Sequence, residues 1–417
     1  MKTEPDVLIV GGGAIGICSA YYLAEQGASV SLVEMNEVAS GCSQANAGLI
    51  VPSYIIPLAS PGVLSQGLKW MLKSDSPFYI KPRFDLSLIQ WLWRFRRACG
   101  SRRMPGAMQA LRELSSASSG LFQDLIAKES LACEYRRRGW LMVYKTDTGL
   151  NKARKEARLL EHYNVETRLL STDETIAMEP MLKPDISGGV FYPEDSHLDP
   201  AKFVRAVADT LSKKGVEIHE HTEAIEFENS RKSIEAVRTT AGVFRPKQVL
   251  LAAGSWSPAL GRKLGLSLAL QPGKGYSVSI KKPDPCPRIP LYLSETKVAV
   301  TPLDDTLRFG GTLEFVGMDF RLNERRVNAI KHAAGEYLAR MESLESGEIW
   351  SGLRPCSPDG LPLIGRSREF GNLMVATGHG MLGISLAPIT GKLISQLAGG
   401  LTPDIGLTPL SLARFGC

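Results

Sequence analysis

The chain has 417 residues and a net charge of +6, with 44% hydrophobic and 22% charged residues. A chain of this length exceeds one ordinary core, so we expect two interleaved domains. The mild and scattered positive charge excludes a dedicated nucleic-acid binder. The seven cysteines form no CxxC pair and no cluster with histidine, which argues against a metal site, an iron–sulfur site and a disulfide framework and indicates a reducing compartment.

The N-terminal apolar run is too short for a signal peptide, and no stretch approaches the roughly 20 apolar residues of a spanning helix. We therefore expect the protein on the cytoplasmic side of the inner membrane.

The first elements follow one another closely. Residues 6–10 (DVLIV) predict a short buried strand, and the glycine-rich run 11–16 (GGGAIG) predicts a tight turn. Residues 17–26 have helical spacing, and residues 29–34 (SVSLVE) predict a second strand. The order strand, turn, helix, strand is the context in which a glycine-rich turn binds a dinucleotide.

The turn carries the pattern G-x-G-x-x-G at Gly11, Gly13 and Gly16, and Glu34 closes the second strand. In this pattern Gly11 permits the turn, Gly13 lets the backbone approach a pyrophosphate, and Gly16 lets the helix touch the strand. The N-terminus of the helix faces the phosphates, and Glu34 is placed to accept hydrogen bonds from ribose hydroxyls. The N-terminal unit therefore predicts an adenine-dinucleotide site.

The continuation favours FAD over a nicotinamide cofactor. Residues 40–49 (SGCSQANAGL) are small and polar and suit the flank of an extended cofactor, whereas a nicotinamide dehydrogenase continues with further βαβ units. The nucleotide-binding pattern resumes only at 216–228 and 248–256, and Asp199 with Pro200 predicts the N-cap and first residue of a helix that re-enters this domain. An interrupted domain suits FAD, whose flavin extends toward a second domain.

Residues 61–105 combine tryptophans and cations. The region contains Trp70, Trp91 and Trp93 beside Lys69, Lys73, Lys81, Arg83, Arg94, Arg96, Arg97, Arg102 and Arg103, against only Asp75 and Asp85. Residues 86–97 (LSLIQWLWRFRR) predict an amphipathic helix that is either an interfacial membrane anchor or a capping helix packed on the second domain. Both interpretations stay open.

Taken together, several blocks of the chain resemble the FAD-dependent amine oxidoreductases of the D-amino-acid oxidase superfamily, and most closely bacterial D-amino-acid dehydrogenases of the small-subunit type. The blocks extend from residue 7 to about 396 and read VLIVGGGAIGICSAYYLAEQG, SQANAGLIVPSY, LDPAKFV, AAGSWS, QPGKGYSVSI, RFGGTLEFVG, WSGLRPCSPDGLPLIGR and ATGHGMLGISLAPITGKLIS. The similarity to this family is therefore nearly full length.

The resemblance implies a doubly wound, Rossmann-like FAD domain of the α/β class, and an α+β substrate domain with a large antiparallel sheet. We expect the FAD domain at residues 1–52, 195–258 and 352–417, and the substrate domain at 53–194 and 259–351, with 61–105 as an insert that faces a membrane or a partner. FAD is expected to bind noncovalently, although Cys356 lies close to a block that carries covalent flavin in some relatives. The residues that the resemblance and the dinucleotide pattern assign to FAD are Gly11, Gly13, Ala14, Ile15, Gly16, Glu34, Met35, Cys42, Ser43, Asn46, Ala47, Gly48, Leu49, Ala224, Ala253, Gly254, Trp256, Gly380, Met381, Leu382, Gly383 and Ile384.

The resemblance also implies the catalytic groups. Arg354 is expected to bind the substrate carboxylate through two parallel hydrogen bonds, the alternative being an ion pair with another carboxylate such as Asp359. Lys274 and Tyr276 are expected either to line the pocket or to be an exposed lysine and a packed tyrosine on a strand edge, and Tyr54 is a further pocket candidate.

Two further predictions concern the turn at residues 378–383 and the strand and helix beside it. His379 is a candidate general base, but a turn histidine bonded to backbone is favoured, because hydride transfer from a neutral amine needs no strong base. Residues 374–376 predict a strand, and residues 384–398 predict a helix whose N-terminus points at the flavin and favours its anionic reduced form.

The implied reaction is oxidative deamination of a D-amino acid or cyclic imino acid to a 2-oxo acid and ammonia, by hydride transfer to flavin N5. Electrons are expected to pass to a quinone or another electron-transfer partner, with peripheral membrane association. Two alternatives stay open: an oxygen-using oxidase of the glycine or sarcosine type, and the flavin subunit of a larger complex such as a D-hydroxyproline or opine dehydrogenase.

Overall fold

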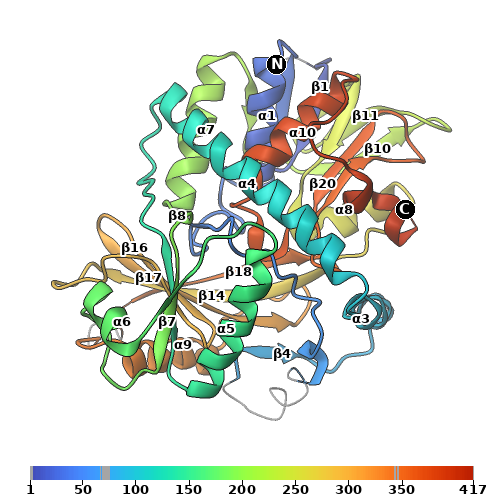
Figure 1. The fold of residues 1–417 in the computed structure, drawn as a ribbon. Helices are drawn as coiled ribbons and strands as arrows, with labels where there is room; N and C mark the ends of the chain where they lie inside the picture. Colours follow the sequence, from blue (N-terminus) through green and yellow to red (C-terminus); the bar gives the residue numbers. More distant parts are fainter. Residues whose placement is uncertain (1–2, 66, 68–75, 342–343, 345–346, 417) are drawn as a thin grey trace.

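The computed structural model describes residues 3–65, 67, 76–341, 344 and 347–416, and two large sheets organise it (Figure 1). A six-stranded sheet forms the half that contains both ends of the chain. Its strands, in spatial order, are β19 (Leu363–Arg366), β20 (Leu373–Thr377), β13 (Gln248–Leu251), β1 (Val7–Val10), β2 (Val30–Val33) and β9 (Glu217–His219). All neighbours are parallel except β19 and β20. This arrangement confirms the predicted doubly wound fold.

Helices cover one face of the six-stranded sheet. They are α1 (Ala14–Glu25), α7 (Pro200–Lys213), α10 (Ala387–Ala398) and the long α4 (Met104–Glu129). As predicted, Asp199 caps α7, accepting a hydrogen bond from the Lys202 amide at 2.9 Å. Phe122 of α4 packs on Phe203 of α7 with ring centroids 5.0 Å apart, so α4 joins the core of the six-stranded half although it lies in the range expected for the substrate domain.

The other face of this sheet is covered by a small antiparallel sheet and a short helix. The elements are β10 (Ala224–Asn229), β11 (Ile234–Thr239), β12 (Gly242–Phe244) and α8 (Ser257–Lys263), whose apolar side chains share a core with β1, β13 and β20. The central strands β1, β2, β13 and β20 are therefore buried on both faces, which accounts for their continuous apolar runs.

A nine-stranded sheet forms the second half. Its spatial order is β18 (Glu348–Cys356), β14 (Gln271–Lys281), β17 (Thr306–Phe315), β16 (Val298–Pro302), β15 (Leu291–Leu293), β5 (Trp140–Tyr144), β7 (Gly188–Tyr192) and β6 (Arg168–Leu170), with β4 (Phe78–Ile80) paired to β17. The pairs β15–β5 and β17–β4 are parallel and the others antiparallel. The helices α5 (Asp147–Glu161), α6 (Thr172–Met178) and α9 (Glu324–Tyr337) pack against it.

Short elements connect the two halves. A two-stranded sheet joins β3 (Leu49–Ile50) to β8 (Ser196–His197), and the 3-10 turns are η1 (Gly254–Trp256), η3 (Gly380–Leu382), η4 (Thr408–Leu410) and η5 (Leu412–Phe415). The helix predicted from residue 384 begins three residues later, at Ala387 in α10, after the η3 turn. Gly378 and Gly380 have φ angles of 80° and 53°, which hold the chain in a turn, and Pro388 belongs to the first helical turn, where its missing N–H costs nothing.

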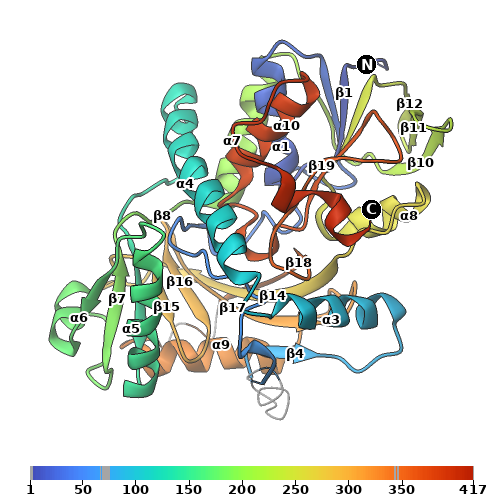
Figure 2. The same cartoon turned by 45° about the vertical axis from the view of Figure 1, so that its right-hand side comes forward.

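The predicted amphipathic helix is α3 (Leu86–Ala98), which lies beside β14 (Figure 2). Trp91 is buried, and its Nε1 donates a hydrogen bond to the Cys356 carbonyl at 2.9 Å. Trp93 on the outer face is 57% exposed, with the Arg97 guanidinium 4.5 Å from its ring centroid. The inner face of α3 thus packs as a capping helix does, while Leu86, Ile89 and Trp93 on its outer face are exposed.

Of the predicted tryptophan-rich region, Trp70, Lys69, Lys73 and Asp75 lie outside the described residues. Within the part of the chain that the structure describes, no helix has both the length and the apolar character needed to cross a bilayer.

Candidate active site

Two cavities meet between the halves of the molecule. One, of about 280 Å³, lies along the carboxyl ends of β1 and β2, and the other, of about 380 Å³, lies against the nine-stranded sheet. Both are lined by Cys42, Asn46, Arg354, Met381 and Ile384. We call them the nucleotide cavity and the substrate cavity.

The nucleotide cavity begins at the glycine-rich turn. Gly11 has a φ angle of 117°, and a Cβ on Gly16 would overlap the Gly11 carbonyl, so the close contact of α1 with β1 requires glycine at both positions. Glu34 directly follows β2. Its carboxylate accepts hydrogen bonds from the Gly12 amide at 2.7 Å and the Asn36 amide at 3.0 Å. The turn therefore has the shape and the acidic group that the sequence pattern predicts.

Most of the predicted cofactor residues line this cavity. They are Gly11, Gly13, Ala14, Ile15, Glu34, Met35, Cys42, Ser43, Asn46, Ala224, Ala253, Gly254, Trp256, Gly380, Met381, Gly383 and Ile384. Four others, Ala47, Gly48, Leu49 and Leu382, line the substrate cavity instead, and Gly16 lies beneath the turn and lines neither.

The segment between the cavities is anchored to the substrate half. The Arg308 guanidinium donates to the Asn46 carbonyl at 3.1 Å, and the Thr301 hydroxyl donates to the Ala47 carbonyl at 2.7 Å. Arg308 also forms an ion pair with Asp199 at 3.3 Å, which links this segment to the start of α7. The predicted cofactor segment 40–49 is therefore held in place by both halves.

Arg354, on β18, lies where the cavities meet. Its Nη1 donates to the Thr312 carbonyl at 2.9 Å, and burial lowers the pKa of its guanidinium. Among the described residues no carboxylate lies within 4.0 Å of it. Asp359, the alternative partner that the sequence offered, instead accepts hydrogen bonds from Arg414 at 2.8 and 3.2 Å. The guanidinium is thus free to bind a carboxylate that enters the cavity.

Two neighbours set the position of Arg354. Its guanidinium lies directly over Gly275 of β14, where a Cβ would come within 3.0 Å of three guanidinium atoms. Thr312 has a φ angle of 66°, a conformation that a β-branched residue rarely adopts, and this turns its carbonyl toward Arg354. The unusual backbone angle of Thr312 and the absence of a side chain at Gly275 together position the guanidinium of Arg354.

Aromatic side chains line much of the substrate cavity. Tyr54, predicted as a pocket residue, does line it, and its ring lies 6.0 Å from Trp140. Trp140 also contacts Tyr192 at 6.1 Å and Tyr292 at 5.4 Å. Burial raises the pKa of the Tyr54 hydroxyl, an effect that the charge of Arg354 opposes. The wall suits an apolar or aromatic substrate side chain.

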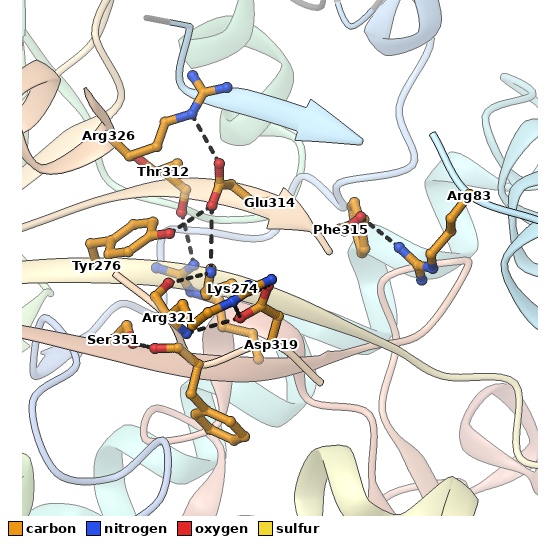
Figure 3. A network of polar contacts seen from close by, with 12 residues as sticks. Arg83, Lys274, Tyr276, Thr312, Glu314, Phe315, Asp319, Arg321, Arg326 and Ser351 are labelled. Carbon is orange, nitrogen blue, oxygen red and sulfur yellow. Dashed lines mark hydrogen bonds and ion pairs between the residues drawn. The ribbon is translucent and has the colours of Figure 1, made fainter. Parts of the chain in front are cut away.

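Lys274 and Tyr276 take part in a buried polar network (Figure 3). The Tyr276 hydroxyl donates to Glu314 at 2.7 Å, and the Lys274 Nζ donates to the Arg321 carbonyl at 2.8 Å and lies 4.0 Å from Glu314. Arg326 completes the network with an ion pair to Glu314 at 3.0 Å. Tyr276 still borders the substrate cavity, but Lys274 lines neither cavity.

The alternative of a strand edge with an exposed lysine is wrong for Lys274, because β14 lies between β17 and β18 and the lysine is 3% exposed. A β-bulge between Lys274 and Tyr276 leaves both side chains facing Glu314. Burial lowers the pKa of Lys274, and burial together with the bond to Glu314 raises that of Tyr276. Both groups therefore have partners within the protein.

His379 is buried, and its Nε2 lies 3.0 Å from the Thr390 hydroxyl, whereas the sequence favoured a backbone partner. Burial lowers the pKa of His379 to about 3, so its ring is neutral. It lines the nucleotide cavity and not the substrate cavity. This placement favours a structural role over that of a general base.

The two cysteines near Arg354 are protonated. Burial raises the pKa of Cys42 and of Cys356 to about 12 in each case, although Arg354 opposes the shift. Cys42 lines both cavities with its Sγ donating to the Leu353 carbonyl, while Cys356 lines neither. A thiol held in this form is a poor nucleophile, in keeping with the expectation of noncovalent FAD.

Several cavity residues were not singled out from the sequence, among them Ser53, Trp140, Tyr292, Lys297 and Thr312. The doublet of glycines before Thr312 is a local signal of a bulged strand, which could have drawn attention to that position. The aromatic residues lie singly on separate strands, so only the folded sheet brings them together.

Comparison with known proteins agrees with this geometry. The family model of DAO FAD-dependent oxidoreductases matches residues 6–397. The chain belongs to this family. It is 32% identical over 416 residues to a protein of Mesorhizobium japonicum named D-amino acid dehydrogenase 1, covering 98% of this chain and 99% of the relative. A D-amino acid dehydrogenase of Bradyrhizobium diazoefficiens is 33% identical, with 98% of each chain covered. The crystal structure of glycine oxidase from Geobacillus kaustophilus aligns with a TM-score of 0.81 and 25% identity over 99% of both chains.

The family makes this protein an FAD-dependent oxidoreductase, and the residues present fit that cofactor. The first turn of α1 leaves backbone N–H groups without intrahelical acceptors, which is where a pyrophosphate binds. Ser43, whose hydroxyl accepts a hydrogen bond from the Ala14 amide at 3.0 Å, lines the cavity beside them, and Glu34 would accept hydrogen bonds from the ribose hydroxyls of a bound FAD. The continuity with the substrate cavity at Arg354 leaves room for a flavin to face a substrate.

Proposed function

We propose that this protein oxidises a D-amino acid to an imino acid, which hydrolyses in water to a 2-oxo acid and ammonia. The observation that carries the proposal is Arg354, whose guanidinium has no carboxylate partner among the described residues and lies where the two cavities meet. The preference for the D-enantiomer rests on the curated relatives that bear the name D-amino acid dehydrogenase.

Each residue has a distinct part in the proposed reaction. Arg354 binds the α-carboxylate through two parallel hydrogen bonds and so fixes the α-carbon. Tyr54 and the aromatic wall contact the side chain and exclude water. FAD, when bound, supplies the acceptor for the hydride that leaves the α-carbon. His379 stays neutral and removes no proton from the substrate, because it does not line the substrate cavity; the amine loses its ammonium proton to water before the hydride leaves.

The proposed electron acceptor is a quinone at a membrane surface. On the outer face of α3 and just before it, Phe84 is 92% exposed, Leu86 65%, Ile89 49% and Trp93 57%. The helix ends in exposed arginines, which suits contact with acidic lipid headgroups. A protein that rests on the bilayer through this face gives electrons to an acceptor dissolved in it.

The test is anaerobic bleaching of the flavin absorbance by a panel of D- and L-amino acids, glycine, sarcosine and proline analogues, followed by readmission of air. Fast bleaching by D-amino acids that persists in air supports the proposed dehydrogenase. Rapid reoxidation with stoichiometric hydrogen peroxide selects the oxidase, and no bleaching by any substrate selects the partner-dependent subunit.

The likeness to glycine oxidase favours one rival, an oxidase of small amines. The aromatic wall of the substrate cavity argues against it, since glycine has no side chain that could contact Tyr54, Trp140 or Tyr292. Turnover of glycine faster than of any larger D-amino acid would overturn this argument.

A further inference from the structure

The substrate cavity carries a second cation. Its wall includes Lys297, at the start of β16, and Glu156 of α5. Tyr292 lies between this cation and Arg354: the Lys297 Nζ is 5.7 Å from its ring centroid, and the charge of Arg354 opposes the rise in the pKa of Tyr292 that burial causes. The cavity thus has one positively charged side chain, Arg354 or Lys297, on either side of the Tyr292 ring.

Lys297 is half-buried, and among the described residues its ammonium has no hydrogen-bond or ion-pair partner, its one polar contact being with the face of the Tyr292 ring. Burial lowers the pKa of Lys297, and the charge of Lys152 adds to this effect, while the charges of Glu156 and Glu295 oppose it. Its φ angle of 61° is one that lysine rarely adopts, so the backbone is held there by its surroundings.

The nearby carboxylates are already bound. Glu295 accepts hydrogen bonds from the Lys145 amide at 3.1 Å, the Thr146 hydroxyl at 3.0 Å and the Tyr337 hydroxyl at 2.5 Å.

Glu156 lies 3.5 Å from Lys152, in a pair that is 39% and 69% exposed and therefore well screened. Both carboxylates act on Lys297 only through space, since neither lies within 4.0 Å of its ammonium, so Lys297 remains able to form a direct hydrogen bond to an anion that enters the cavity.

We propose that Lys297 binds an anionic group at the end of the substrate's side chain. The inference rests on the proposed function and narrows it: the preferred substrates are D-amino acids with a second carboxylate, separated from the α-carbon by an apolar or aromatic segment. Arg354 binds the α-carboxylate and Lys297 the distal one.

The test compares acids with their isosteric amides in anaerobic flavin reduction. Two pairs serve: D-2-aminoadipate with its side-chain amide, and D-4-carboxyphenylalanine with D-4-carbamoylphenylalanine. In the wild type, kcat/KM for the acid of at least one pair exceeds that for its amide by at least tenfold. In Lys297→Met this ratio falls to about one, while Lys297→Arg retains most of it. Met resembles lysine in length but carries no charge, whereas Arg keeps the charge, so the two variants together separate the effect of charge from that of side-chain size.

Lys155→Met is the matched control, because this exposed lysine of α5 lines neither cavity. In this variant the ratio of kcat/KM for the acid to kcat/KM for its amide should stay within twofold of the wild-type ratio. A wild-type preference for the amides, or an acid preference that survives Lys297→Met, overturns the assignment. So does a preference for D-lysine that is lost in Glu156→Gln, which would make Glu156 the recognition residue. If neutral D-amino acids reduce the flavin without any acid preference, only this inference fails, whereas no reduction by any D-amino acid refutes the proposed function as well.

Discussion

Gly275→Ala tests the proposed function without removing any polar group from the protein. The added Cβ would come within 3.0 Å of the Arg354 guanidinium, which must therefore move away from its seat. Two charge-assisted hydrogen bonds to the substrate carboxylate are lost or distorted, and each is worth about 1.5–3 kcal/mol. Two such bonds total roughly 3–6 kcal/mol, which corresponds to a loss of about 10²- to 10⁴-fold in kcat/KM.

The assay is steady-state reduction of an artificial dye by the FAD-loaded variant. Arg354→Met should show a loss of the same size, and the double variant should be no worse than either single one, because both changes remove one interaction. Gly335→Ala, on α9, is the matched control for a glycine-to-alanine change, since a Cβ there meets nothing within 4 Å, and its activity should equal that of the wild type. FAD content should be unchanged in all of them. Losses that multiply in the double variant would refute the idea that Gly275 acts through Arg354.

Three further predictions concern buried groups and α3. Burial raises the pKa of Asp195 to about 8 from its ordinary 3.8, so the folded chain holds a proton that the unfolded chain lacks, and stability should fall as pH rises from about 4 to 8. Asp195→Asn should flatten that slope in thermal melts, and an unchanged slope would contradict the assignment. His379→Gln, which can still bond to Thr390, should lower kcat by less than tenfold and leave the pH profile intact; loss of one limb of that profile would identify a general base. Trp91→Ala should cost about 3–5 kcal/mol in unfolding free energy, whereas Trp93→Ala should leave stability nearly unchanged and weaken sedimentation with anionic vesicles; equal effects of the two on stability would argue against a free outer face.

The nucleotide half could be predicted from the sequence because its signals are local. Gly11, Gly16 and Glu34 lie within one βαβ unit, where spacing along the chain fixes spacing in the structure. Asp199 is similar, since an N-cap bonds to an amide three residues on. The start of α10 was placed three residues too early because residues 384–386 (ISL) are as apolar as the helix that follows, whereas Pro388 is the signal that marks the first helical turn.

The substrate half could not be predicted in the same way, because its contacts join distant strands. Lys274 and Tyr276 lie beside Gly275 in sequence, yet their side chains face Glu314 while Arg354 occupies the space over the glycine. Which face a residue takes depends on a bulge in the pairing of β14 with β17, and no pattern within β14 reveals it.

Backbone strain gives a further reason to treat the substrate cavity as one functional unit. Among the described residues, Thr312 is the one β-branched residue with φ between 20° and 160°, and Lys297 is another non-glycine residue in that region. Both line the same cavity. Each such conformation costs on the order of 1–3 kcal/mol and persists only where the surrounding structure enforces it. At Thr312 the strained backbone supplies the carbonyl that holds Arg354. At Lys297 the turn between β15 and β16 directs toward the cavity an ammonium that lies over the Tyr292 ring and has no hydrogen-bond or ion-pair partner among the described residues.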